Sequence, residues 1–170
     1  MKARDERAAW AYAERLIAIR PRTVAELERR LVSRGFAPDL VRRVVDRAHA
    51  AGLVDDRLFA CLYAEDRLLS RPCARRLIVK ELRDHGVDAP LAEEAAQAAF
   101  PELPEEELAH RALVARLPLW QGLPRDAVER RAAAFLLRRG FAPSLAKAVI
   151  KETLHVGRSL TAENAEEATE

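Results

Sequence analysis

Residues 34–40 read Arg-Gly-Phe-Ala-Pro-Asp-Leu, and residues 139–145 repeat this stretch with Ser in place of Asp. Between them, residues 85–91 read His-Gly-Val-Asp-Ala-Pro-Leu. A Gly after a helical segment takes the left-handed backbone conformation that ends the helix. The Pro that follows suits the first turn of the next helix, where its missing N–H is not needed. The three stretches therefore predict three equivalent junctions between a second and a third helix.

Periodic apolar residues place a helix on each side of every junction and a further helix before each pair. We expect the first helices at about 6–20, 56–69 and 105–117, and the third helices at about 38–51, 89–99 and 143–155. Thr23, with Glu26 three residues later, forms the pattern of a capping box at the start of a second helix. Asp126 and Glu129 repeat that pattern and predict a second capping box.

These patterns predict an all-α protein, an elongated tandem array of three three-helix repeats. The expected repeats are residues 1–54, 55–100 and 101–156, and residues 157–170 are expected to form an acidic, disordered tail. A three-helix unit of about 45–50 residues buries too little surface to be stable alone. Neighbouring units in an array can cover each other's apolar edges.

The composition of the 170-residue chain agrees with a helical fold. It is 49% hydrophobic but only 5% aromatic, and 33% of its residues are charged. The charged fraction argues against a membrane protein, and its combination with abundant Leu argues against disorder. The charged start and the absence of a long apolar run predict a soluble, cytoplasmic protein. Cys61 and Cys73 are spaced neither as a zinc site nor as a disulfide framework, so we expect no metal or cofactor.

The sequence contains no constellation that would indicate an enzyme. It lacks a Gly-rich phosphate loop, an HExxH motif and a GxSxG motif. Asp55 and Asp56 are adjacent, and their position suits an N-cap followed by a first-turn acid. His85 falls in the last turn of a helix, where a cation suits the helix dipole. We therefore expect a binding protein and no catalytic residues.

Basic clusters are the strongest functional signal. The last ten residues hold four Glu and no basic residue, so the rest of the chain carries 29 basic and 23 acidic side chains, a net charge of +6. Clusters that recur in equivalent helices could align into a basic stripe for a protein partner or DNA. The alternative is a solvated face with helical ion pairs such as Glu26–Arg30. The candidate contact residues are Arg29, Arg30, Arg42, Arg43, Arg75, Arg76, Lys80, Arg83, Arg130, Arg131, Arg138 and Arg139.

Four stretches resemble the RecX family of regulatory proteins. They are residues 23–36, residues 52–60 (Gly-Leu-Val-Asp-Asp-Arg-Leu-Phe-Ala), residues 75–87 and residues 135–141. The second is similar to the family signature G-L-(L/I)-(D/N)-D-x-x-(F/Y)-A, and the resemblance covers about residues 8–155.

The resemblance implies a non-enzymatic modulator of the RecA recombinase. Such a protein lies along the groove of the RecA–single-stranded DNA filament and suppresses its ATPase, strand exchange and coprotease activities. It would thereby modulate DNA repair, recombination and the SOS response. The resemblance also implies weak binding of single- or double-stranded DNA in some members. We expect a monomer that does not associate with membranes.

Two other interpretations of the residues remain. A helix-turn-helix protein that binds DNA directly would place a basic second or third helix in the major groove. Residues 55–100 hold seven basic and nine acidic side chains, which disfavours a continuous DNA-binding face. The third interpretation is a helical adaptor with no link to DNA, which would not respond to removal of the arginines.

Overall fold

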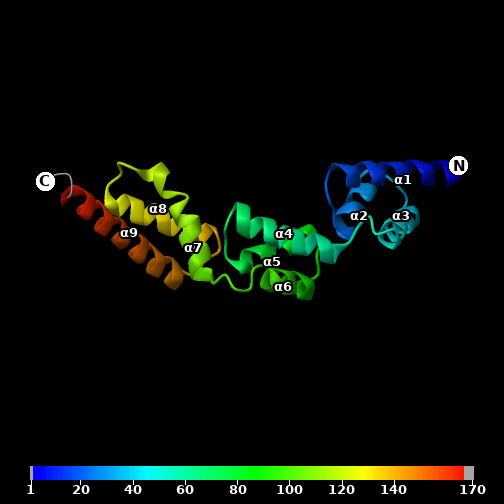
Figure 1. Ribbon diagram of the computed structural model, residues 1–170. Helices are drawn as coiled ribbons and strands as arrows, with labels where there is room; N and C mark the ends of the chain where they lie inside the picture. The colour runs from blue at the N-terminus through cyan, green and yellow to red at the C-terminus, as the bar shows by residue number, and fades with distance from the viewer. Residues whose placement is uncertain (1, 167–170) are drawn as a thin grey trace. The chain divides into compact units, whose positions relative to one another are not determined.

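The computed structural model describes residues 2–166, with side chains described for residues 5–155. Within these residues the chain is entirely helical, as predicted, and contains no strand (Figure 1). The elements are α1 (Lys2–Ile19), α2 (Val24–Ser33), α3 (Pro38–Ala50), α4 (Asp56–Ser70), α5 (Arg75–His85), α6 (Ala89–Ala98), α7 (Glu105–Val114), the 3-10 helix η1 (Leu117–Trp120), α8 (Arg125–Arg138) and α9 (Pro143–Glu166).

The chain divides into two compact units, although its α-helices follow one another in three groups of three. Unit 1 comprises Met1–Glu65 and Val79–Ala99, and unit 2 comprises Asp66–Ile78 and Phe100–Glu170. The middle group is therefore shared, because α4 and α5 each contribute residues to both units. A group of this size has little apolar surface with which to close a core of its own.

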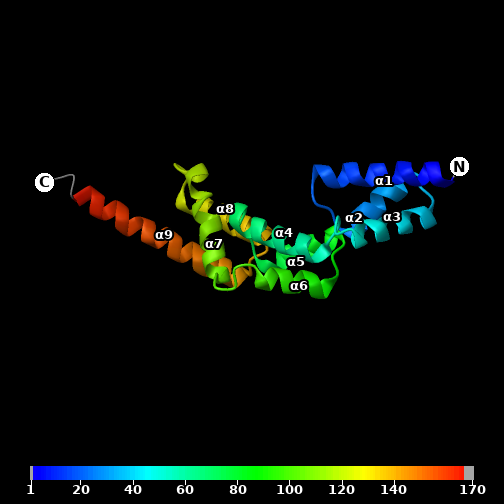
Figure 2. The same cartoon turned by 45° about the vertical axis from the view of Figure 1, so that its right-hand side comes forward.

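The core of unit 1 lies between α1, α2 and α3, which Figure 1 and Figure 2 show side by side. Leu27 and Leu31 of α2 are four residues apart, share one helix face and are fully buried. Val41 and Val44 of α3 pack in the same core. The small Ala13 of α1 is also fully buried, since a methyl side chain lets the helices approach closely.

The core of unit 2 is built mainly from α7, α8 and α9, which also lie together in both views. Leu108 and Leu113 of α7 and Leu136 of α8 are fully buried. The ring of Trp120 in η1 meets the ring of Phe135 edge to face, with 6.1 Å between centroids. The single turn of η1 thus closes one end of this core.

The three predicted Gly junctions are confirmed. Gly35, Gly86 and Gly140 have φ angles of 89°, 96° and 84°, in the left-handed region. After each Gly, the next residue donates its backbone N–H to a carbonyl of the helix's last turn. These bonds join Phe36 to Leu31, Val87 to Leu82 and Phe141 to Leu136 at 3.3, 3.0 and 3.1 Å. The repeated motif is a Schellman-type helix end, as the spacing predicted.

The first predicted capping box is confirmed at its N-cap, and the second is wrong. The Thr23 hydroxyl accepts the Glu26 backbone N–H at 3.1 Å. At α8 the N-cap is Pro124, which has no side-chain cap, and Asp126 lies inside the first turn. Pro124 holds extended backbone with φ −55° and ψ 144°, so the helix starts at Arg125 rather than after an N-cap at Asp126.

Two helix C-terminal ends differ from the expected positions, and α1 begins at Lys2 instead of at about residue 6. α7 ends at Val114, and the chain continues as η1 instead of as one helix to residue 117. α9 extends to Glu166, whereas the sequence predicted a disordered tail from residue 157. α9 continues through Gly157 because a single internal Gly costs a helix only about 1 kcal/mol, and no Pro follows Gly157 in the sequence. The remaining part of the predicted tail, residues 167–170, lies outside the described residues.

Candidate functional site

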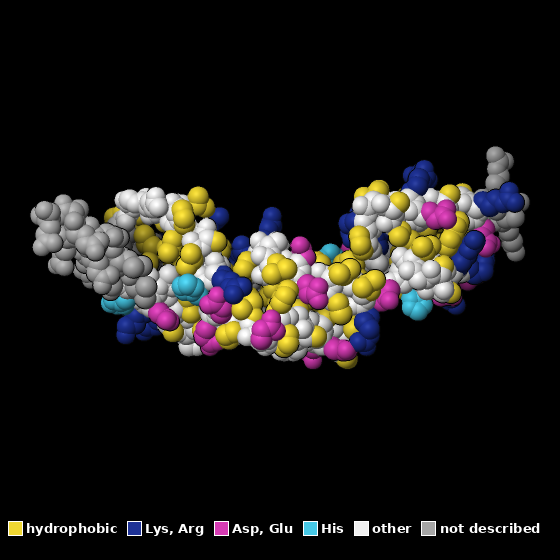
Figure 3. Space-filling view, in the orientation of Figure 1, with side chains coloured by type: hydrophobic (Ala, Val, Ile, Leu, Met, Phe, Trp, Pro, Cys, Tyr) yellow, Lys and Arg dark blue, Asp and Glu magenta, His cyan; other side chains and the backbone are white. Residues whose placement is uncertain are grey.

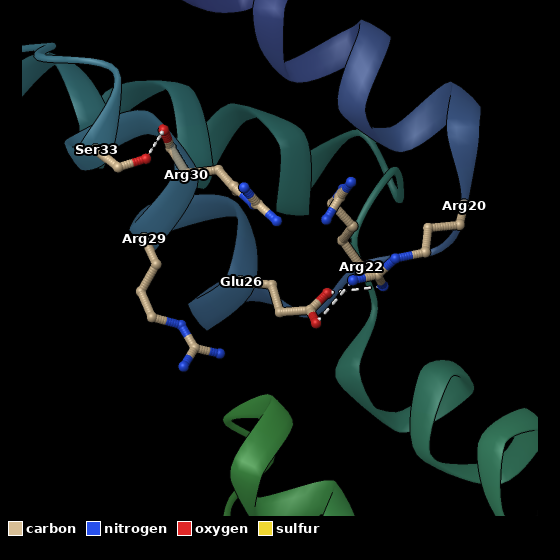
Figure 4. Close-up of a pocket in the computed structure, with 6 residues that line it drawn as sticks. All are labelled: Arg20, Arg22, Glu26, Arg29, Arg30 and Ser33. Carbon is tan, nitrogen blue, oxygen red and sulfur yellow. Dashed lines mark hydrogen bonds and ion pairs between the residues drawn. The ribbon is translucent and has the colours of Figure 1, made fainter.

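An arginine-lined hollow of about 330 Å³ lies in unit 1 beside α2 (Figure 4). Four of its six lining residues are arginines. Arg20 and Arg22 come from the turn between α1 and α2, and Arg29 and Arg30 come from α2 itself. The lining residues are Arg20, Arg22, Glu26, Arg29, Arg30 and Ser33. The tight turn brings the two groups together because Thr23 starts α2 only one residue after Arg22.

Glu26 is the carboxylate of the hollow, and its oxygens are already engaged. Arg20 binds it through two nitrogens at 2.9 and 3.0 Å. The Nδ1 atom of His85, on α5, lies 2.8 Å from the same carboxylate. Burial raises the pKa of Glu26, but the hydrogen bonds from Arg20 and His85 outweigh it and hold the pKa below its ordinary value of 4.5. Glu26 therefore bridges α2, the α1–α2 turn and α5 as an ionised group.

Arg22 and Arg30 have no ion-pair partner among the described residues. Arg22 is only 8% exposed, and its Nε donates to the Leu16 carbonyl at 3.0 Å. Burial, and next the charge of Arg20, lower the pKa of Arg22. The expected helical ion pair between Glu26 and Arg30 does not form, because Arg20 and His85 occupy the carboxylate. Figure 4 shows Arg22 and Arg30 extending toward each other above Glu26.

The Arg29 side chain points away from Arg22 and Arg30, toward the end of α5 (Figure 4). Its Nε donates to the Ala25 carbonyl and its Nη2 to the His85 carbonyl, both at 3.2 Å. The His85 carbonyl also accepts the Thr23 hydroxyl at 2.6 Å. The predicted position of His85 in the last turn of its helix is confirmed. What the sequence could not reveal is that this helix end is capped by residues of α2 and its N-cap.

The adjacent acids at the start of α4 cap two different helices. Asp55 accepts the Leu58 backbone N–H at 2.9 Å, as expected for an N-cap. Asp56 instead accepts the Val24 backbone N–H at 2.8 Å, at the first turn of α2. Burial raises the pKa of Asp56 above its ordinary value of 3.8. The pair therefore stabilises helix ends.

Three predicted contact residues are used inside unit 2. Arg75 is 8% exposed and donates to the Phe100 carbonyl at 2.8 Å, so it is not available on the surface. Arg76 binds the carbonyls of Gly140 and Phe141 just after α8. Arg139 is half-buried and donates to the Pro72 carbonyl at 3.1 Å, and burial lowers its pKa. These side chains join the start of α5 to neighbouring backbone.

The other predicted contact residues are exposed but differ in their partners. Three form ion pairs, namely Arg43 with Glu6 at 3.7 Å, Lys80 with Asp84 at 2.7 Å, and Arg130 with Asp126 at 2.6 Å. Apart from Arg29 and Arg30, which are described above, the others form no ion pair within the described residues: Arg42, Arg83, Arg131 and Arg138. On the face shown in Figure 3, Lys and Arg side chains are interspersed with acidic and apolar ones.

Sequence reasoning missed Arg20 and Arg22. The signal was present, because Arg20-Pro21-Arg22 directly precedes the Thr23 capping box. Residues placed just before a helix start lie close to its first turn. Their position before the helix start would have predicted that Arg20 and Arg22 lie close to Arg29 and Arg30.

Among the described residues, no group of His, Cys, Asp and Glu is arranged to hold a metal ion. No described helix is long and apolar enough to span a bilayer. Cys61 is partly exposed, Cys73 is buried, and neither forms a disulfide within the described residues. The distinctive polar feature of the described surface is thus the arginine-lined hollow.

The fold defines an all-helical class of protein, in which α-helices follow one another in groups of three. Family models described as the first and second three-helix domains of RecX match residues 9–47 and 55–95. The chain is 38% identical over 155 residues to the regulatory protein RecX of Mycobacteroides abscessus, covering 89% of this chain and 74% of that protein. It is 36% identical over 141 residues to the RecX of Thermobifida fusca, covering 82% and 75%. The chain belongs to the RecX family of regulatory proteins.

Solved structures agree on the fold. The crystal structure of RecX from Lactobacillus salivarius aligns with a TM-score of 0.72, covering 89% of this chain and 97% of that one at 19% sequence identity. A second crystal structure of a regulatory protein RecX aligns with a TM-score of 0.70 at 18% identity.

Replacing Glu26 by Gln is expected to destabilise unit 1 by about 1–3 kcal/mol at neutral pH, because hydrogen bonds to a charged group are lost. Since the folded-state pKa of Glu26 lies below 4.5, its contribution is complete above that pH and is lost as the pH falls through the lower, folded-state pKa. The difference between the variant and the parent should therefore shrink in acid. Urea unfolding followed by circular dichroism at several pH values measures it.

Glu28→Gln is the matched control, because Glu28 is exposed on the same helix. It should leave the unfolding midpoint nearly unchanged at neutral pH. A loss of stability in Glu26→Gln that is equally large at neutral and strongly acidic pH would contradict the assigned role of the carboxylate.

Proposed function

We propose that this protein is a non-enzymatic regulator of the RecA recombinase. It binds the RecA–single-stranded DNA filament in the cytoplasm and inhibits ATP hydrolysis, strand exchange and coprotease activity, and so modulates DNA repair, recombination and the SOS response. The observation that carries the proposal is 36–38% identity over more than four fifths of the chain to proteins named regulatory protein RecX.

The charge distribution supports docking by many modest contacts. Exposed ion pairs are worth only about 0.2–1 kcal/mol each, so no single arginine is expected to dominate. A filament presents the same acidic groups and phosphates repeatedly, and several weak contacts to one molecule then add through effective concentration. The proposed contacts are those predicted contact residues that are exposed and whose side chains form neither an ion pair nor a hydrogen bond to backbone within the described residues: Arg30, Arg42, Arg83, Arg131 and Arg138. We propose that the protein acts as a monomer.

The test is an assay of RecA with ATP and single-stranded DNA. Substoichiometric amounts of the protein should slow ATP hydrolysis and strand exchange. Absence of inhibition at concentrations approaching that of RecA would reject the proposal. Tight duplex binding with a preferred sequence and a steep salt dependence would instead favour a direct DNA-binding protein.

The double variant Arg131→Ala/Arg138→Ala should weaken inhibition by roughly 2- to 30-fold, which corresponds to two exposed charge contacts. The control Arg111→Ala/Arg125→Ala makes the same change in net charge. Arg111 and Arg125 already pair with glutamates on their own helices at 2.6 and 2.8 Å. The control should inhibit like the parent, and equal inhibition by both double variants would remove Arg131 and Arg138 from the contact surface.

A further inference from the structure

The hollow beside α2 carries more positive charge than its own residues neutralise. It is lined by four arginines and one glutamate, an excess of three positive charges. Glu26 is shared between Arg20 and His85 and leaves Arg22 and Arg30 without a carboxylate. An anion placed in the hollow would relieve the repulsion between these guanidinium groups.

Two of the donors of the hollow, Arg20 and Arg22, are already held in position. The Nε of Arg22 donates to the Leu16 carbonyl, and this bond leaves the terminal nitrogens of the Arg22 guanidinium available. Arg20 is held by Glu26 and by the Pro21 carbonyl at 2.8 Å. Arg30 is exposed and extends over the hollow opposite Arg22 (Figure 4). Because Arg20 and Arg22 are positioned before a ligand arrives, binding needs to order only Arg30 among these three and costs less conformational entropy.

We propose that this hollow is a phosphate-binding site. A phosphate group offers several oxygens that can accept hydrogen bonds from more than one guanidinium fork, whereas a single carboxylate offers two. The lining includes no aromatic or large apolar side chain on which a base could stack, so it would recognise phosphate without reading sequence. The inference deepens the proposed function and rests on it for the expected occupant, a backbone phosphate of the filament's DNA.

Two sources can supply such a phosphate, and two probes distinguish them. Pyrophosphate, followed by isothermal titration calorimetry at low ionic strength, reports a free phosphate. A fluorescent oligothymidine, followed by anisotropy over a salt series, reports a nucleic-acid backbone. The variant is Arg30→Ala, and the control is Arg57→Ala on α4, which removes the same charge outside the hollow, where Arg57 already pairs with Glu94 at 2.6 Å. Circular dichroism checks that both variants stay folded.

The parent and the control should bind pyrophosphate, and the hollow variant should bind it roughly tenfold more weakly or worse. If the backbone enters the hollow, the plot of log K against log salt for oligothymidine becomes shallower by about 0.7 in the hollow variant, the value for one lost phosphate contact on a single strand. Pyrophosphate should then compete with the oligonucleotide. If oligothymidine binding is unchanged while pyrophosphate binding is lost, the hollow is a site for a free phosphate.

Three results would overturn the proposal. The first is no pyrophosphate binding by the parent at low ionic strength. The second is an equal loss in the hollow variant and in the control. The third is binding of a polyglutamate peptide at this site in place of pyrophosphate. Neither readout contains RecA, so failure of RecA inhibition and failure of phosphate binding are separate outcomes.

Discussion

Gly86→Ala is expected to lower the free energy of unfolding by about 2–5 kcal/mol, a sum of backbone strain and overpacking. Gly86 has a φ angle of 96°, which an L side chain rarely adopts. A Cβ at this position would lie 2.4 Å from the Cβ of Ala25, so α2 and the turn after α5 would have to separate. Urea unfolding followed by the helical circular dichroism signal measures the loss.

The substitution Gly52→Ala separates the cost of backbone strain from the cost of the steric clash at Gly86. Gly52 also has a positive φ, of 66°, but an added Cβ would meet nothing within 4 Å. Its substitution should therefore cost only the strain of the left-handed conformation, about 1–2 kcal/mol. Adding Ala25→Gly to Gly86→Ala removes the Cβ that causes the clash, so the double variant should regain part of the lost stability. The two substitutions should therefore be non-additive in a double-mutant cycle. Equal losses for the Gly86 and Gly52 variants would show that the close approach to Ala25 does not matter.

Arg75→Ala is expected to destabilise unit 2 by about 2–4 kcal/mol, through a lost charged hydrogen bond and lost packing. Arg75 is 8% exposed, and the substitution leaves the Phe100 carbonyl without the guanidinium at 2.8 Å. The backbone N–H of Arg75 also binds the Glu105 carboxylate at 3.1 Å, so this residue joins the start of α5 to the start of α7. The thermal unfolding midpoint of the variant reports the effect.

Arg131→Ala is the control for Arg75, because Arg131 is exposed on α8 in the same unit. An exposed substitution of this kind usually changes stability by no more than about 0.5 kcal/mol. Equal midpoints for the two variants would contradict a buried structural role for Arg75. If the prediction holds, a loss of RecA inhibition in an Arg75 variant reports unfolding and not a lost partner contact.

Most of the secondary structure could be predicted because its signals are local. A left-handed residue after a helix favours Gly, and this rule located the helix ends at Gly35, Gly86 and Gly140. Thr23 was likewise identified as a cap from residues within four positions of it. The failure at Asp126 is local too, since the extended Pro124 starts α8 earlier than the capping pattern suggested.

The candidate site could be predicted only in part, because contact with a partner depends on which side chains remain exposed. Arg75 and Arg76 are adjacent and identical, and on a helix they point about 100° apart. Arg75 is buried and donates to the Phe100 carbonyl, whereas Arg76 donates to the Gly140 carbonyl just after α8. Arg29 and Arg30 were identified from clustering, but the turn after α1 supplies the other two arginines of the hollow.

The amino-acid sequence by itself determined the helices, the junctions between them and the family, since each depends on residue types at short spacing. Only the tertiary structure decided which charges remain available. Asp56 looked like a first-turn acid of its own helix, yet it accepts the Val24 backbone N–H from 32 residues away. Helix packing sets such pairs, and helix propensity does not encode them, because an unsatisfied buried donor takes whichever acceptor the fold brings within reach.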